Sequence, residues 1–125
     1  MAEESVESRR NKAVSSTWNS SKELEKLAED EDQQVRLGVA ENSNTPSSVL
    51  EKMAGDENEE VRSCVAGNPN TTSVSILAKL AEDEDEEVRM MVATNTNTPV
   101  SLLEKLAEDE DEDVRIAVAE NKNIQ

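Results

Sequence analysis

The stretch D-E-D-E-E-V-R-M-M-V-A-T-N-T-N-T-P, residues 83–99, decides the fold because it recurs along the chain. Matching stretches begin at Asp30, Asp56 and Asp109, so that successive copies are separated by 26, 27 and 26 positions. The one extra residue falls in a connector, residues 70–76, where insertions are tolerated. Self-similarity at this period is typical of proteins whose stacked units bury each other's apolar faces. The sequence therefore predicts a repeat array.

Each unit begins with an apolar cluster that has helical spacing. In the second unit, Val49, Leu50 and Met53 stand at i, i+1 and i+4 and share one helical face. Thr45 and Pro46 precede this cluster. Because a threonine hydroxyl can cap a helix and proline is tolerated at the first helical position, they predict where the helix starts. The fourth unit begins in the same way, at Thr98-Pro99.

A second apolar cluster follows in each unit, with the i, i+4 spacing of Val35 and Val39. It predicts a shorter helix of two to three turns. An acid or amide stands where the N-cap belongs, and an asparagine, which tolerates a left-handed turn, ends the helix. The predicted N-caps are Asp32, Asn58, Asp85 and Asp111, and the predicted ends are Asn42, Asn68, Asn95 and Asn121.

Neither helix is stable alone, but stacked pairs bury their apolar stripes in a continuous core. We therefore expect an all-α fold, a right-handed α-solenoid of about four two-helix repeats. The expected parts are a flexible tail (1–5) and a single domain (6–125), the latter made of a capping half-repeat (6–23) and repeats at 24–49, 50–76, 77–102 and 103–125.

The capping half-repeat rests on R-R-N-K-A-V, residues 9–14, which aligns with V-R-x-x-V-A of the repeat. This alignment puts Arg10 in the place of the repeat's arginine. Trp18, the single tryptophan in a chain without Phe or Tyr, follows directly. Large apolar side chains are more often buried than exposed for ligands, so we expect Trp18 to plug the open end of the core.

The motif D-x-x-x-x-V-R-x-x-V-A-x-N-x-N-T-P resembles the leucine-rich repeat variant family, which is similar in style to HEAT and armadillo repeats. The resemblance spans residues 24–123. It implies alternating α- and 3₁₀-helices, so the second helix of each unit is expected to be partly 3₁₀. The best-known family member adds a cysteine-ligated iron–sulfur cluster before its repeats. This chain has no cysteine before Val35, so we expect no cofactor.

Four arginines each stand six residues after an aspartate, across the turn between the two helices of a unit. Partly buried charges need partners, and HEAT-like arrays pair such residues between neighbouring units. We therefore expect a structural ladder. An arginine stripe for phosphate is disfavoured because the surrounding negative charge would repel a polyanion. The ladder residues are Asp30, Arg36, Asp56, Arg62, Asp83, Arg89, Asp109 and Arg115.

Of the 29 acidic residues, 20 lie in the turns between the two helices, at residues 29–32, 56–60, 82–87 and 108–113. Stacking aligns these turns into what we call the acidic ridge. Capping and solubility explain roughly half of the charges, and the surplus favours partner binding. A calcium site is not expected, because the turn glycine and distal glutamate of a calcium loop are missing. The candidate partner-binding acids are Glu82, Glu84, Glu86, Glu87, Glu108, Glu110, Glu112 and Asp113.

Apolar residues also occupy a position on the second helix that rotation by ~100° per residue turns away from the core. They predict a partner-facing stripe, and burial between neighbouring units is an equally weighted alternative. That position holds Leu37, Ser63, Met90 and Ile116, and the candidates are its three apolar residues together with Met91 beside them. Cys64 lies beside them and has no histidine to activate it, so we expect a small core residue rather than a nucleophile.

The net charge of −16, with no histidine, favours binding over catalysis. Because a catalytic histidine, a Gly-rich phosphate loop and a pocket motif are all missing, we expect no enzyme, no catalytic residue and no metal site. We expect a cytoplasmic module for a basic or amphipathic protein partner, monomeric or paired end to end, with no direct nucleic-acid or membrane binding. The alternative is an inhibitor that mimics nucleic acid and occupies the basic groove of a DNA- or RNA-binding protein.

Overall fold

The computed structural model describes residues 4–15 and 20–124. Within these ranges the chain forms nine α-helices and no strand. From α2 onward, helices of seven and nine residues alternate. The helices are α1 (Val6–Val14), α2 (Ser21–Leu27), α3 (Gln33–Glu41), α4 (Ser47–Met53), α5 (Glu59–Gly67), α6 (Val74–Leu80), α7 (Glu86–Thr94), α8 (Val100–Leu106) and α9 (Glu112–Glu120).

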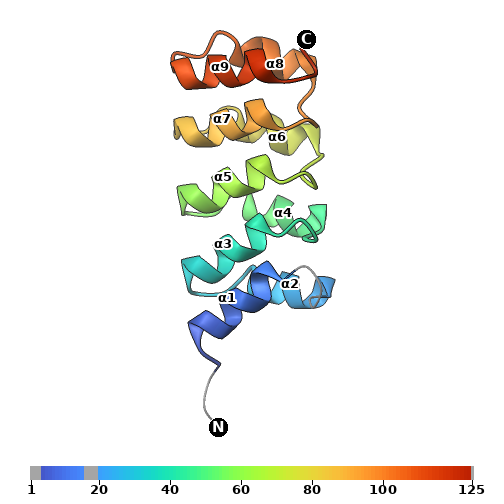
Figure 1. Ribbon diagram of the computed structural model, residues 1–125, viewed down its shortest axis with the longest axis vertical. Coiled ribbons are helices and arrows are strands. Elements are labelled where there is room, and N and C mark those ends of the chain that lie inside the picture. The colour runs from blue at the N-terminus through green and yellow to red at the C-terminus, as the bar shows by residue number, and fades with distance from the viewer. Residues whose placement is uncertain (1–3, 16–19, 125) are drawn as a thin grey trace.

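The helices stack into a column with α1 at one end and α8 and α9 at the other (Figure 1). We call α1, α3, α5, α7 and α9 the odd layer, and α2, α4, α6 and α8 the even layer. Neighbouring helices of the odd layer pack directly on one another, whereas each even-layer helix mainly contacts the odd-layer helices beside it. This arrangement confirms the predicted all-α repeat solenoid.

A continuous core runs between the two layers. Burial of a leucine or valine side chain stabilises a fold by ~1.5–3 kcal/mol, and each unit contributes several. The stacked units therefore supply the stability that a single pair lacks. The even layer contributes Leu24, Leu50, Leu77 and Leu103, each at most 1 % exposed, and the odd layer contributes Val35, Val61, Val88 and Val114, each 0 % exposed.

Two predictions about the second helix of each unit are wrong. This helix has nine residues and is the longer of the pair, since the first has seven. It is also α-helical from end to end in all four units, so the 3₁₀ character implied by the resemblance is not found. Nine residues still amount to the predicted two to three turns, and packing on odd-layer neighbours stabilises these helices.

The predicted N-caps of the second helices are confirmed, as when Asp85 Oδ1 accepts the Glu87 N–H at 2.8 Å. The predicted caps of the first helices are wrong. Pro46 occupies the N-cap position of α4, and no side chain caps that helix. Thr45 Oγ1 instead donates to the Val39 carbonyl at 2.7 Å, because this buried hydroxyl lies beside the last turn of α3, where that carbonyl also accepts the Asn42 N–H.

Helix α1 extends the odd layer, but in a different register from the prediction. Arg9, not Arg10, holds the place of the repeat's arginine, since Arg9 Nε lies 2.7 Å from Asp30 Oδ2. The helix packs closely on α3 at Gly38, where a Cβ would come within 2.9 Å of the Ala13 Cβ. A glycine is therefore needed at this contact. Trp18, expected to plug this end of the core, lies outside the described residues.

Candidate protein-interaction surface

A ladder of ion pairs links consecutive units along one edge of the odd layer. In Arg36, Arg62 and Arg89, Nε donates to the aspartate of the following unit rather than to the aspartate six residues before it. Side chains in the three full rungs are only 10–14 % exposed. The Nε to Oδ2 distances are 2.9 Å for Arg36 and Asp56, 2.8 Å for Arg62 and Asp83, and 2.9 Å for Arg89 and Asp109.

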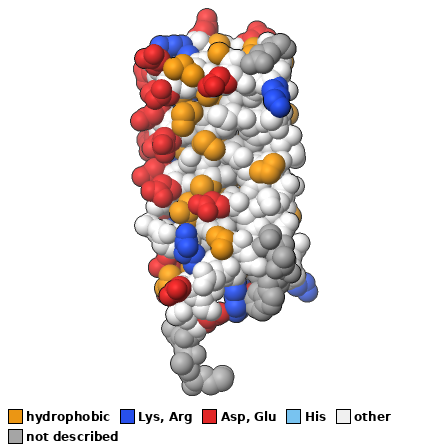
Figure 2. Space-filling view, in the orientation of Figure 1, with side chains coloured by type: hydrophobic (Ala, Val, Ile, Leu, Met, Phe, Trp, Pro, Cys, Tyr) orange, Lys and Arg blue, Asp and Glu red, His pale blue; other side chains and the backbone are white. Residues whose placement is uncertain are grey.

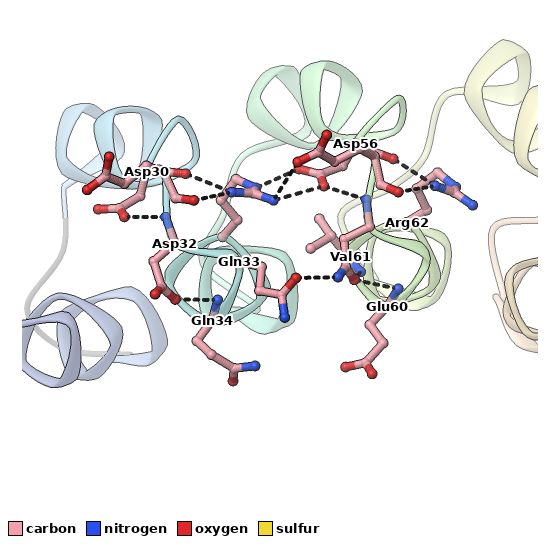
Figure 3. A network of polar contacts seen from close by, with 12 residues as sticks. Asp30, Asp32, Gln33, Gln34, Asp56, Glu60, Val61 and Arg62 are labelled. Carbon is pink, nitrogen blue, oxygen red and sulfur yellow. Dashed lines mark hydrogen bonds and ion pairs between the residues drawn. The ribbon is translucent and has the colours of Figure 1, made fainter.

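Each guanidinium also ties its own unit together. Arg62 Nη1 donates to the backbone carbonyl of Asp56 at 2.8 Å, while Asp56 Oδ1 accepts the Asn58 N–H at 2.9 Å. Figure 3 shows this network around Asp30, Asp56 and Arg62. One arginine therefore holds the turn of its own unit and the carboxylate of the next, which fixes the spacing between units.

The ladder shifts the pKa values of some of its side chains. The hydrogen bond to Asp83 raises the pKa of Arg62, and the bond to Asp109 does the same for the pKa of Arg89. Burial works to raise the pKa of Asp109, but hydrogen bonds from Arg89 and from the Asp111 N–H outweigh it and hold that pKa below its ordinary value. The Arg89–Asp109 pair is therefore charged at neutral pH.

Arg115 ends the ladder. Its Nη1 donates to the Asp109 carbonyl, as the equivalent arginines do within their own units, but its side chain makes no ion pair among the described residues. Arg115 is exposed, in contrast to Arg36, Arg62 and Arg89.

A second ladder, at the opposite ends of the odd-layer helices, was missed at the sequence level. Asn95 is 4 % exposed, and its Nδ2 donates to the Ala66 carbonyl at 2.8 Å and to the Asn68 carbonyl at 3.3 Å, both in the preceding unit. Its Oδ1 accepts the Asn97 N–H at 2.8 Å. The same arrangement recurs at Asn42, Asn68 and Asn121.

These asparagines were predicted for a left-handed turn, and that reason is wrong. Their backbones are extended, with φ near −70°, and no described residue, glycine included, has a positive φ. Asparagine is present because a neutral amide can accept within its own turn and donate to the unit before it. The regular N-x-N spacing could have indicated this, since the second asparagine also donates backward, as Asn97 does to Pro69 O at 2.8 Å.

The candidate partner-binding acids of the ridge are more exposed to solvent than the ladder aspartates. The ladder aspartates are half-buried, whereas all eight candidate partner-binding acids, including Glu86 and Asp113, are exposed. None of the eight forms an ion pair within the part of the chain that the structure describes. Acidic side chains follow one edge of the column in Figure 2. The structure thus places a row of unneutralised carboxylates at the N-terminal ends of the odd-layer helices.

The candidate apolar residues do not all behave alike. Leu37, Met90 and Met91 are half-buried and pack against the core, whereas Ile116 is 48 % exposed. Met91 lies over Gly67 of the preceding unit. Packing against the core thus covers part of Leu37, Met90 and Met91, while Ile116 is exposed, and the partner-facing role of these residues stays a prediction. Figure 2 shows hydrophobic side chains in a band beside the acidic edge.

Cys64 is half-buried beside this band. Burial raises the pKa of its thiol to about 11, and the carboxylate of Glu41 adds to the effect. The thiolate that nucleophilic chemistry requires is therefore rare at neutral pH.

Other features of the described chain carry little chemistry. A cleft of about 400 Å³ separates α6 from α8 and is lined by Ala78, Lys79, Leu102 and Lys105 among others. The described residues contain no group of three or more His, Cys, Asp or Glu arranged to hold a metal ion. None of the described helices has the length and apolar character to cross a membrane.

Comparison with known proteins adds one finding. Residues 34–58 match the family model described as leucine rich repeat variant. This segment runs from α3 to the N-cap of α5 and covers about one period of the array. No curated protein and no solved structure matches the chain. The match confirms the predicted resemblance to the leucine-rich repeat variant family at residues 34–58.

Proposed function

We propose that this protein is a non-catalytic interaction module that binds a basic protein partner along the acidic ridge. The observation that carries the proposal is the set of eight exposed carboxylates that take part in no ion pair of the described structure. Capping and the ladder use other residues, such as Asp83 and Asp85. These eight charges are therefore surplus to the fold.

A row of like charges on a rigid array supports binding in two ways. It attracts a cationic partner over several ångströms and accelerates encounter, more strongly at low salt. It also repels nucleic acid and other polyanions, which narrows the range of partners. Four of the eight carboxylates lie in the first turns of α7 and α9, and the other four lie in the short turns that precede these helices. Because both helices are packed in the array, the pattern is presented with little loss of chain entropy on binding.

A variant that lacks the eight surplus acids but keeps the capping and ladder aspartates tests this proposal. The eight acids are replaced by Gln or Asn, while Asp83, Asp85, Asp109 and Asp111 are kept. Circular dichroism and size measurement check that the variant is folded and monomeric. Both proteins are then immobilised for affinity capture at low and at high salt, with mass spectrometry of what is retained.

The native chain is expected to retain basic proteins at low salt and to lose them at high salt, and the folded variant is expected to retain none of them. Equal capture by the two proteins, or capture that is indifferent to salt, would show that the acidic ridge does not bind the partner.

A further inference from the structure

Three consecutive odd-layer helices combine acidic and apolar side chains on one outer face. Each of α5, α7 and α9 carries two exposed acids in its first turn and half-buried or exposed apolar atoms one turn later. We call this the α5–α9 face. Its acids are Glu59, Glu60, Glu86, Glu87, Glu112 and Asp113, and its apolar side chains are Cys64, Met90, Met91 and Ile116.

The two kinds of side chain form parallel rows along the column. Glu86 and Met90 are four residues apart, which is about 6 Å along a helix axis. Neighbouring odd-layer helices pack directly, so each row repeats at the ~8–10 Å spacing of packed helices. An occupant along the column must therefore offer an apolar stripe beside a basic stripe, both with this period.

The spacing of the rows distinguishes between the backbone conformations that a bound segment could have. In an α-helix, i and i+7 lie on one face and are ~10.5 Å apart, close to the spacing of the rows. In a β-strand, i and i+3 span ~10 Å but point to opposite faces. A polyproline helix repeats at ~9.3 Å, but its usual receptors are aromatic-lined grooves. The described residues of this chain include no aromatic side chain.

We propose that the α5–α9 face docks a basic amphipathic α-helix of a partner protein, which lies along the column. Its apolar residues contact Met90, Met91 and Ile116, and one flank of Lys or Arg repeats every seven residues against the acid pairs. Methionine suits such a contact because its flexible side chain adapts to the partner. The inference rests on the proposed function and goes beyond it in the partner's secondary structure, direction and period.

The chain contains its own control for the acid pairs. Helix α3 carries Gln33 and Gln34 where α7 carries Glu86 and Glu87, and it keeps the same kind of N-cap at Asp32. The double substitution Glu86→Gln with Glu87→Gln therefore gives α7 a first turn that the fold already accepts. Likewise Ser63 stands in α5 where Met90 stands in α7, so Met90→Ser introduces a side chain found in the same register.

The probe is a synthetic three-heptad peptide with Leu at a and d, Lys at e on one flank, and neutral residues elsewhere. A scrambled peptide of the same composition and a peptide with Lys at every third residue serve as comparisons. Fluorescence anisotropy with the full chain measures affinity, and circular dichroism measures helix formation in the peptide on binding.

We expect the heptad peptide to bind at least ~10-fold more tightly than either comparison peptide and to become helical. The Glu86→Gln, Glu87→Gln variant should lose about 5- to 10-fold in affinity at low salt, and Met90→Ser should lose about as much at all salt concentrations. A charge-matched control, Glu51→Gln with Glu104→Gln in the even layer, should bind like the native chain, because these exposed acids lie on α4 and α8.

Equal binding of the scrambled or triplet peptide, or an equal loss in the even-layer control, would overturn the helix-docking inference and leave the acidic-ridge proposal standing. Failure of all three peptides would overturn the inference as well. The capture experiment with the eight-acid variant then decides separately whether the ridge binds anything.

Discussion

Consecutive units are joined at both ends of the odd-layer helices, but different side chains make the contacts at each end. At their N-terminal ends, units are joined by Arg–Asp pairs whose side chains stay 10–14 % exposed in the full rungs. At their C-terminal ends, units are joined by asparagines that are 3–4 % exposed. A neutral amide loses less hydration on burial than a charge does. The asparagine edge can therefore be dry, whereas the charged ladder stays near solvent and the unpaired acids gather beside it.

The largest effect should come from breaking the asparagine edge. Asn95→Ala removes three hydrogen bonds to the preceding unit and the bond that closes its own turn. Buried carbonyls then lose their partners, so the free energy of unfolding should fall by about 2–4 kcal/mol in urea titrations. Asn97→Ala, at a half-buried position, should cost less than half as much. Equal losses would mean that burial does not set the strength of this ladder.

Breaking the charged ladder should cost less. Arg89→Ala leaves the half-buried Asp109 without its 2.9 Å partner, and a loss of about 1–3 kcal/mol in the free energy of unfolding is expected. A double-mutant cycle with Asp109→Ala isolates the pair. A coupling energy near zero would contradict the view that Arg89 and Asp109 hold the third and fourth units together.

Acid should weaken the charged ladder and spare the asparagine edge. Because the folded-state pKa of Asp109 lies below its ordinary value of 3.8, its stabilisation is complete above that value and is lost as the pH falls through the lower folded-state pKa. The difference in unfolding free energy between the native chain and Asp109→Asn should therefore be constant from about pH 5 to 8 and shrink below about pH 4. The deficit of Asn95→Ala should be independent of pH, and a parallel decline would contradict this distinction.

The smallest effect on stability should come from the surplus acids. Glu86→Gln with Glu87→Gln should change the free energy of unfolding by no more than about 0.5 kcal/mol, because both side chains are exposed and outside every ion pair of the described residues. Thermal melts at low and high salt check this. A loss as large as that of Arg89→Ala would show that these acids stabilise the array, and would remove the basis for a binding role.

Much of the architecture could be predicted because equivalent residues of stacked repeats recur at a nearly constant spacing in the sequence. The spacing of Val35, Val61, Val88 and Val114 predicted the buried row that the structure contains. Asp85 was predicted as an N-cap because capping is a local interaction that needs only its own turn. Contacts between units were harder. Thr45 could equally cap the next helix or close the previous one, and only the packed chain brings its hydroxyl to the Val39 carbonyl.

The sequence by itself determined the repeat, the order of the helices, the buried rows and the alignment of acids in every inter-helix turn. Each of these follows from a local residue pattern that recurs at a nearly constant period. The tertiary structure decided which atoms join one unit to the next. It paired Arg89 with Asp109 and Arg9 with Asp30, turned Asn95 toward Ala66, and left Ile116 open while it half-covered Met90. These outcomes depend on the rotation and distance between units, and those arise only when the helices of two layers pack together.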